Sequence, residues 1–414
     1  MRKIKIDTGK SEYLIILTFL FLAAMNFYAK FFYFVFAAFI MLIFTKQHLK
    51  VNIGMIPYIL LGSYMAVYNA DEGVLSVFRC FAYALCFIIG SNMILSISNN
   101  GLSDNGKFEN QIRIGYAVLS AICLGSFVHF MLNFAINQQF VLGRNTNDIW
   151  TGERLSATIQ ASIACLMCGF GVSMIICPRK KFSRLVGIIA IIGIMAYNLM
   201  LAGRTLLIMI ILVLAIGLVY FCLNSERPIH KNNTIIIVIS IFVAIALAFT
   251  FNIAGVQDYI LESNLFSRLD SMKVDGMISG ERTRRKILFL QNIWRYPFGG
   301  LHMRTQFGYA HDLLLDAYDE YGFLEVIFLL IILVSGIRNL ICFCKNKDIS
   351  ISYRLSFLCV YISILCEFCI EPIFEGIPWL FVCYCLLNGC IYGLNCAHLE
   401  RQCDRGEVRE GIAD

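Results

Sequence analysis

Charged residues are scarce in this sequence. They make up 15% of the 414 residues, whereas 59% are hydrophobic and the mean hydropathy is +0.72. Soluble domains have about 25% charged and about 45–50% apolar residues. A chain of this size cannot hide so much apolar surface in one core, because its outer surface still requires polar atoms. The composition therefore excludes an ordinary soluble globular protein and predicts a protein of the lipid bilayer.

Proline is also rare, and several kinds of sequence pattern are missing. The chain has six prolines, no internal repeat, no low-complexity tract and no glycine-rich phosphate loop. Transporters often combine repeated halves with helices that Gly or Pro interrupts. A transporter is therefore disfavoured, although it stays open as an alternative. The net charge of +6 does not indicate nucleic acid, because in a membrane protein the placement of Lys and Arg matters more than their sum.

Cysteine is abundant but absent from the longest polar stretch, residues 252–321. Most of the 17 cysteines lie in apolar segments or near their ends. Cys165-x-x-Cys168 and Cys366-x-x-Cys369 have the spacing of metal ligands, but neither has a histidine or a second pair to complete a site. We predict that the cysteines pack between helices and that the protein needs no metal or other cofactor.

Long apolar runs dominate the rest of the chain and predict an all-α fold. A helix needs about 20 apolar residues to cross a bilayer, and on this rule we expect about twelve spans. They lie near residues 13–29, 31–45, 53–69, 74–97, 114–136, 157–176, 185–201, 205–223, 234–251, 323–337, 355–370 and 378–396.

The placement of Lys and Arg predicts that both termini are cytoplasmic. The N-terminus and every second short loop carry clusters of basic residues, as do the residues after the last span. The predicted organisation is membrane helices over 1–251, an extracytoplasmic loop over 252–322, three further helices over 323–396 and a cytoplasmic tail over 397–414. The expected location is a cytoplasmic membrane that the chain crosses many times. The long loop carries basic residues although it lies outside, which is allowed because long loops translocate regardless of charge.

The charges of the long loop are sorted along the sequence. Between Arg282 and Arg304 there are six basic residues and no acidic one, and Asp312, Asp316, Asp319 and Glu320 follow. A basic patch at the outer leaflet suits a phosphate or pyrophosphate carried by a lipid. The alternative is an amphipathic helix lying among the headgroups. We expect helices over 284–293 and 312–321, the second continuing into the span that begins at residue 323, and a turn at Pro297-Phe298-Gly299-Gly300.

Two side chains stand out as candidates for chemistry. Arg204 lies between two closely spaced spans, where a charge is normally kept for a partner or a ligand, although it could also anchor the chain at the headgroups. His311 stands where the loop returns to the membrane and could act as a general base or bind a pyrophosphate. His302 competes for this role.

The acidic residues that follow His311 form a third candidate. The spacing places Asp312, Asp316 and either Asp319 or Glu320 on one face of a helix, where carboxylates could hold Mg²⁺ or Ca²⁺. No further ligand pattern supports a metal. We therefore expect this face to be solvated.

The order of these features resembles the O-antigen ligase/polymerase family of bacterial membrane glycosyltransferases. The matching elements are Gly203-Arg204-Thr205 at the start of a span, a late outside loop with Ser279-Gly280-Glu281-Arg282 and Tyr296-Pro297-Phe298-Gly299, and then His311-Asp312 before Glu320-Tyr321-Gly322. The resemblance covers about half the chain. Asp312 stands where the family pattern has Asn.

The resemblance implies a GT-C-like fold, a bacterial cytoplasmic membrane and a glycosyl transfer that needs no metal. The donor is a glycan on undecaprenyl pyrophosphate, and an acceptor hydroxyl displaces the lipid pyrophosphate. The implied catalytic residues are Arg204 and Arg282, which would stabilise the leaving group, and His311, either as the base or as a pyrophosphate contact. The implied substrate-binding residues are Arg284, Arg285, Arg154 and Asp312.

The resemblance leaves the acceptor open. A polymerase of O-antigen, capsular or exopolysaccharide repeat units joins two polyprenyl-linked chains, and this is the reading we favour. A ligase would instead pass the glycan to the lipid A-core of lipopolysaccharide, and a transporter or flippase of lipid-linked sugars is the third reading. Expected partners are the lipid-linked donor and acceptor, the bilayer, a chain-length regulator and a flippase, but no nucleic acid.

Overall fold

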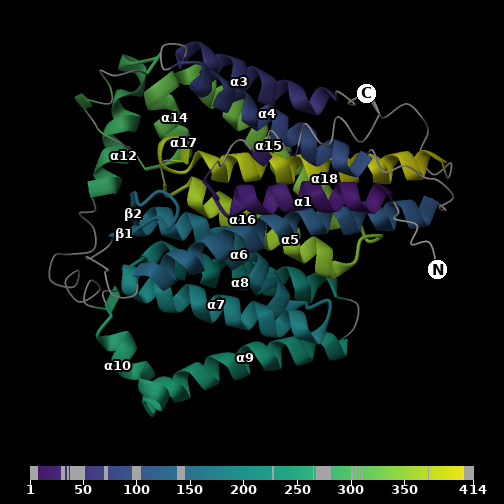
Figure 1. Ribbon diagram of the computed structural model, residues 1–414, viewed down its shortest axis with the longest axis vertical. Helices are drawn as coiled ribbons and strands as arrows, with labels where there is room; N and C mark the ends of the chain where they lie inside the picture. The colour runs from purple at the N-terminus through teal and green to yellow at the C-terminus, as the bar shows by residue number, and fades with distance from the viewer. Residues whose placement is uncertain are drawn as a thin grey trace, which may run out of the picture. The chain divides into compact units, whose positions relative to one another are not determined.

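A computed structural model gives the structure of the protein. It describes residues 8–28, 33–34, 37, 52–69, 73–95, 104–137, 145–225, 228–263, 265–266, 281–299, 303, 305–306, 308, 311–371 and 373–404. Over these residues the chain is almost entirely helical (Figure 1). Within the same ranges, nine helices are long and apolar enough to cross a membrane, and two shorter apolar helices accompany them. The prediction of an all-α protein that crosses a membrane many times is confirmed at this level.

Eleven of the predicted spans coincide with helices of the structure, and the twelfth, 31–45, falls largely outside the described residues. The bounds differ most for the helices with polar ends. The helix predicted over 114–136 begins ten residues earlier, at Asp104, and the spans predicted over 323–337 and 378–396 continue to Lys345 and Asp404. The hydropathy rule stops at the first polar cluster, whereas the backbone hydrogen bonds of a helix continue into water.

The chain divides into two compact units. Unit 1 comprises residues 1–125, 321–349 and 378–414, and unit 2 comprises residues 126–320 and 350–377. Unit 1 contains α1 (Thr8–Ala24), η1 (Ile53–Met55), α3 (Ile56–Tyr68), α4 (Val74–Leu95), the first part of α5 (Asp104–Asn137), α15 (Phe323–Lys345) and α18 (Pro378–Asp404).

Helices α4 and α18 pack closely against each other in unit 1. A Cβ atom placed on Gly90 would lie 2.2 Å from the carbonyl oxygen of Leu386, and one on Gly389 would lie 2.2 Å from that of Phe87. The two backbones can approach so closely only because neither position has a side chain. Small residues at such contacts are typical of helix pairs in membranes, where packing rather than water drives association.

Unit 2 holds the rest of α5 and the remaining elements of the described residues. These are β1 (Asn145–Asn147), β2 (Arg154–Ser156), α6 (Ala157–Ile176), α7 (Lys181–Leu201), α8 (Arg204–Asn224), α9 (Pro228–Thr250), η3 (Ile253–Gly255), α10 (Val256–Leu261), α12 (Glu281–Asn292), η4 (Ile293–Arg295), α14 (Leu313–Tyr321, with Tyr321 itself in unit 1), α16 (Ile351–Phe368) and α17 (Ile373–Gly376).

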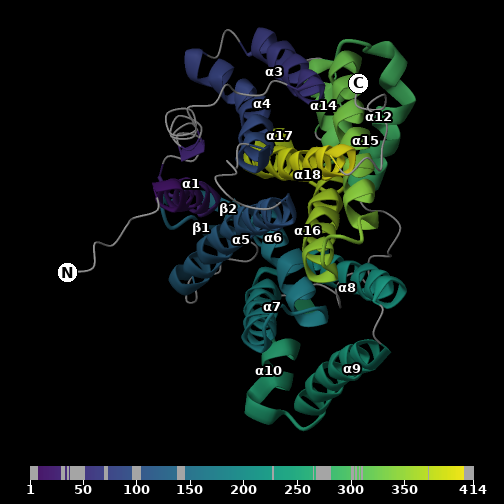
Figure 2. The same cartoon turned by 90° about the vertical axis from the view of Figure 1, so that its right-hand side faces the viewer.

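Helix α6 is the centre of unit 2. Nearly all its residues are buried, and it packs against α7, α8 and α16. By contrast, α9 lies at the periphery in both views (Figures 1 and 2), and many of its apolar side chains are exposed, including Ile236, Ile239 and Val243. The exposed apolar surface of a peripheral helix is what a lipid-facing helix of a membrane protein presents.

Contacts between helices fix their directions. Ser162 near the start of α6 meets Glu367 near the end of α16, and Ser173 near the end of α6 meets Ser356 near the start of α16. The two helices are therefore antiparallel. Gly217, about two thirds of the way along α8, lies against Ile176 at the end of α6, so α8 runs parallel to α6.

These directions bring one set of helix ends together, which we call the hairpin end of unit 2. It comprises the ends of α5, α7 and α16, the starts of α6 and α8, and the small sheet of β1 and β2. Figure 1 shows β1, β2, α10 and α12 at the same end. Elements with predicted site residues reach this end: β2 with Arg154, the start of α8 with Arg204, and α12 with Arg284 and Arg285.

Two features of the backbone differ from the sequence-based expectation. The antiparallel pair of β1 and β2, in which Asn147 faces Arg154, was not predicted, because strands of three residues leave no periodic pattern in the sequence. Helices α14 and α15 are also separate rather than continuous. Gly322 lies between them with φ 83°, a conformation that favours glycine and ends the first helix.

Candidate functional site

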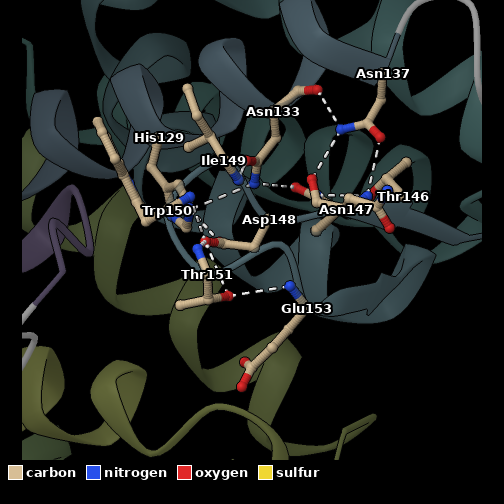
Figure 3. A network of polar contacts seen from close by, with 11 residues as sticks. His129, Asn133, Asn137, Thr146, Asn147, Asp148, Ile149, Trp150, Thr151 and Glu153 are labelled. Atoms are coloured by element: carbon tan, nitrogen blue, oxygen red, sulfur yellow. Dashed lines mark hydrogen bonds and ion pairs between the residues drawn. The ribbon is translucent and has the colours of Figure 1, made fainter.

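Residues 145–156, which lie between α5 and α6, form a short hairpin held by buried polar side chains (Figure 3). His129, Asn133 and Asn137 are spaced four residues apart and so lie on one face of α5. All three are buried, as are Asp148 and Gln160, which they help to contact. Buried polar groups are costly unless hydrogen bonds satisfy them, so a cluster of this size is retained for what it holds in place.

His129 and Asp148 form the centre of this network. The Nε2 atom of His129 lies 2.7 Å from Oδ2 of Asp148, and their side chains are 0% and 3% exposed. The other carboxylate oxygen of Asp148 accepts hydrogen bonds from the backbone N–H of Trp150 at 2.9 Å and of Thr151 at 3.0 Å. Asp148 therefore links α5 directly to the turn of the hairpin.

The contacts of Asp148 also stabilise its negative charge. Burial alone raises the pKa of this carboxyl group. The hydrogen bond and electrostatic attraction of His129, with the amides of Trp150 and Thr151, outweigh burial and lower the pKa from 3.8 to about 2. The carboxylate is thus fully ionised at neutral pH.

Three amide side chains fasten the strands of the hairpin to the helix ends. The side chain of Asn137 both donates to the carbonyl of Asn147 at 2.8 Å and accepts from its N–H at 2.9 Å. Asn133 accepts from the N–H of Ile149 at 3.0 Å, and Gln160 on α6 donates to the hydroxyl of Thr146 at 2.9 Å. The hairpin is therefore held from both α5 and α6.

Arg154 is the predicted site residue that lies on this hairpin. It opens β2, pairs with Asn147 across the sheet and has an exposed side chain. Asn147 is the residue whose backbone Asn137 holds on both sides, so the position of Arg154 is fixed through its strand partner.

Arg204 begins α8 at the same end of unit 2. The chain reverses just before it, with Ala202 in the left-handed region at φ 55°. A Cβ on Gly203 would lie 2.3 Å from Oδ1 of Asn198, so a larger residue here would require the Asn198 side chain to move. A helix N-terminus carries a partial positive charge, and a basic side chain there adds to it. The start of α8 is therefore a positively charged corner, as an anionic ligand requires.

The returning part of the long loop is tied to two other segments by Lys286 on α12. Its ammonium group donates to Oδ2 of Asp312 at 3.0 Å and to the backbone carbonyl of Cys369 at 2.9 Å. Cys369 follows directly after α16, whose end meets the start of α6. Lys286 therefore connects α12, the start of α14 and the hairpin end of unit 2.

His311 and Asp312 directly precede α14. His311 adopts φ 56°, a left-handed conformation that is uncommon for a residue with a side chain. Asp312 caps the helix, since its Oδ1 accepts from the N–H of Leu314 at 3.1 Å, and its own N–H donates to Asp316 at 2.9 Å. Backbone strain of this kind clusters at functional sites, which is consistent with the role expected for His311.

The structure describes the side chains of Arg284 and Arg285 in the long loop but not that of Arg282. The Arg284 side chain is exposed on α12, and the Arg285 guanidinium lies against Gly308, where an added Cβ would be 3.0 Å from one of its nitrogens. The side chain of Arg282, like the whole of His302, lies outside the described residues. Which arginine faces a substrate therefore stays a prediction.

The acidic face of α14 is not solvated, and that prediction was wrong. Asp316 is 8% exposed and Asp319 is 2% exposed. The hydroxyl of Tyr318 donates to the carbonyls of Ile293 and Tyr296, so α14 packs against the segment that follows α12. Tertiary packing decides burial here, because the helix pattern alone does not say what covers it. Within the described residues, no group of three His, Cys, Asp or Glu side chains could hold a metal ion.

Several residues of the hairpin end were missed by sequence reasoning. They are His129, Asp148, Gln160, Lys286 and Glu367. The polar stripe at 129, 133 and 137 in an otherwise apolar helix was a usable signal, since intramembrane polar residues mark functional or packing sites. The partners of that stripe follow from the hairpin, which the sequence did not reveal.

Most of the cysteines lie inside the helix packing, as expected. Cys165, Cys168, Cys383 and Cys385 are buried, whereas Cys369 is exposed at the end of α16. All cysteines of the described residues are in the free thiol form.

No protein-family model matches this chain, and no curated protein matches its sequence.

Proposed function

We propose that this protein is a membrane glycosyltransferase that polymerises glycan repeat units carried on undecaprenyl pyrophosphate, at the outer face of a bacterial cytoplasmic membrane. The acceptor is a second lipid-linked glycan. One of its hydroxyl groups attacks the anomeric carbon of the donor, the bond from that carbon to the pyrophosphate oxygen breaks, and the lipid pyrophosphate leaves with the electron pair.

One observation supports this function most strongly. The basic helix α12 is tied through Lys286 to the entrance of α14 and to the end of α16, within the unit whose α8 begins with Arg204. The long loop is thus anchored where a positively charged helix start lies. A pyrophosphate carries the charge that suits such a place, and Arg forms paired hydrogen bonds with its oxygens.

Each site residue has a role in this proposal. Arg204 and Arg282 stabilise the negative charge that develops on the departing pyrophosphate. This charge contributes most to the activation barrier of the reaction. His311 accepts the proton of the acceptor hydroxyl or donates a hydrogen bond to the pyrophosphate. Arg284, Arg285 and Arg154 bind the donor, and Asp312 orients the His311 segment as the cap of α14.

Purified protein with lipid-linked repeat units tests this function. We expect the wild-type protein to lengthen the glycans, Arg204→Ala and His311→Ala to reduce the rate at least 100-fold, and Arg338→Ala to keep it. Arg338 is an exposed arginine of α15 and serves as the matched control. Product length is measured by gel electrophoresis and mass spectrometry.

Two outcomes would contradict the proposal. Full activity of both Arg204→Ala and His311→Ala would remove the mechanism, and no lengthening by the wild-type protein would remove the polymerase. Transfer only after lipopolysaccharide core is added as acceptor would make the protein a ligase instead.

A further inference from the structure

The turn of the hairpin presents a compact set of side chains at the hairpin end of unit 2. Trp150 is half-buried there, and Thr151, Gly152, Glu153 and Arg154 follow it with exposed side chains or backbone. In Figure 3 the Glu153 side chain points away from the His129–Asp148 pair. Within five residues, the turn therefore offers an aromatic ring, a hydroxyl, a carboxylate and a guanidinium.

The turn is ordered from within before anything binds. Asp148 accepts from the N–H groups of Trp150 and Thr151, and the carbonyl of Asp148 accepts from the N–H of Gly152 at 2.9 Å. The Thr151 hydroxyl accepts from the N–H of Glu153 at 3.2 Å, and Gly152 adopts φ 69°. Because these contacts fix the backbone, a ligand need not bear the entropic cost of ordering it.

The network beneath the turn exceeds what a simple connection requires. Helices in membrane proteins are commonly joined by short connections, yet here five buried polar side chains of α5, α6 and the hairpin hold one hairpin in place. Desolvating such groups is costly, and each must be matched by a partner. The buried His129–Asp148 pair therefore acts as a support that sets the position of residues 150–154.

We propose that the turn from Trp150 to Arg154 binds the saccharide portion of the substrate, and that His129 and Asp148 position it. A sugar ring has an apolar face of C–H groups, which stacks on an indole, and an edge of hydroxyls, which both donate and accept hydrogen bonds. Glu153 accepts from hydroxyls and Arg154 donates to them. A bare phosphate or pyrophosphate does not fit this set, because the Glu153 carboxylate repels it.

The placement agrees with the chemistry. The turn lies at the same end of unit 2 as Arg204, the residue assigned to the pyrophosphate under the proposed function, on which this inference rests. A lipid-linked glycan has its anionic group at one end and its sugars beyond it, so it needs a charged contact and a neutral polar contact at separate places. Arg204 and the hairpin turn are two such contacts from different elements.

Binding without turnover tests the inference. The probe is the oligosaccharide released by mild acid from lipid-linked glycans of the membranes that contain the protein, and it carries no pyrophosphate. Calorimetry with the full-length protein in detergent measures its affinity. We expect Trp150→Ala to weaken binding at least tenfold, Glu153→Gln to weaken it several-fold and Trp150→Tyr to restore most of it.

Trp294→Ala is the control, because Trp294 is a tryptophan of the long loop, 85% exposed, outside the hairpin. It should bind the oligosaccharide as the wild type does. His129→Gln should weaken binding. Its unfolding temperature is compared with that of Trp150→Ala, which serves as the reference for a folded variant. Undecaprenyl pyrophosphate without sugar should not compete with the oligosaccharide.

Wild-type affinity in Trp150→Ala, or equal weakening by Trp294→Ala, would overturn the inference. A change of Trp150→Ala in membrane insertion alone would also overturn it, since Trp150 would then be an interfacial anchor. The proposed function fails separately. If the wild-type protein lengthens no glycan but its oligosaccharide binding depends on Trp150, polymerisation is wrong and the saccharide site stands.

Discussion

Asp148 shows how one buried residue ties local chemistry to the stability of a membrane protein. Its carboxylate contacts His129 and accepts hydrogen bonds from two backbone N–H groups. The lowered pKa of about 2 reflects how strongly these contacts favour the charged form. In the long loop, Lys286 forms an ion pair with Asp312, and His311 adopts an uncommon backbone conformation just before α14.

The pKa of Asp148 predicts an acid-dependent loss of stability. A carboxyl group with a lowered folded-state pKa stabilises the protein above its unfolded pKa near 4, and this contribution is lost as the pH falls from about 4 to about 2. The contribution is about 2 kcal/mol. Thermal unfolding in detergent should show that Asp148→Asn is less stable than wild type at pH 7 and that the difference shrinks toward pH 3.

Glu109→Gln is the control for this measurement. Glu109 pairs with Arg113 at 2.6 Å, but both side chains are more than 60% exposed. An exposed ion pair contributes little, so this variant should match the wild type at every pH. A stability difference for Asp148→Asn that stays constant with pH would contradict the role of the charge.

At the scale of elements, the position of α6 depends on glycine. A Cβ on Gly169 would lie 2.5 Å from the carbonyl oxygen of Cys359 and 2.6 Å from Cα of Val360, so α6 and α16 touch through their backbones. This contact lies between the Ser162–Glu367 and Ser173–Ser356 pairs and holds both in register. The hairpin end depends on that register, because the carbonyl of Cys369, just after α16, accepts a hydrogen bond from Lys286.

Gly169→Ala should therefore destabilise unit 2. The new methyl group has no room without backbone movement, and overpacking of this kind costs about 1–3 kcal/mol. Thermal unfolding of the purified protein measures the effect. Gly376→Ala is the control, since nothing lies within 4 Å of a Cβ there. Equal unfolding temperatures for the two variants would show that the helices can separate without loss.

At the scale of the whole molecule, the direction of the chain across the membrane decides where the site operates. Charge placement predicts that the long loop after α9 is outside and that the connection between α15 and α16 is cytoplasmic. The hairpin end contains the start of α6 and the end of α16, whereas the α15–α16 connection, Asn346–Ser350, is at the other end of α16.

Reporter fusions test this orientation. Alkaline phosphatase fused after Glu262 should be active, because this enzyme folds only outside the cytoplasm, and the same fusion after Lys347 should be inactive. Fusions of green fluorescent protein should give the opposite pattern. Active phosphatase at both positions, or at Lys347 alone, would mean that the chain is inserted differently and that the proposed site faces the wrong side.

The sequence by itself determined the class of protein and the positions of most helices. Apolar runs such as 157–176 and 205–223 report a local property, the affinity of each segment for lipid, and this property needs no tertiary partner to be read. The same holds for the turn at Gly299, where Tyr296 accepts from its N–H at 2.9 Å. Arg204 and His311 stood out because charge and histidine are rare beside apolar segments.

Only the tertiary structure decided which polar residues act together. The pairs His129–Asp148, Lys286–Asp312 and Ser162–Glu367 join residues 19, 26 and 205 positions apart, and each depends on how helices fold back on one another. Burial is decided in the same way, which is why Asp319 is covered although its helix pattern suggested a solvated face. Contacts between distant residues arise from packing, and a pattern along the chain reports only its own segment.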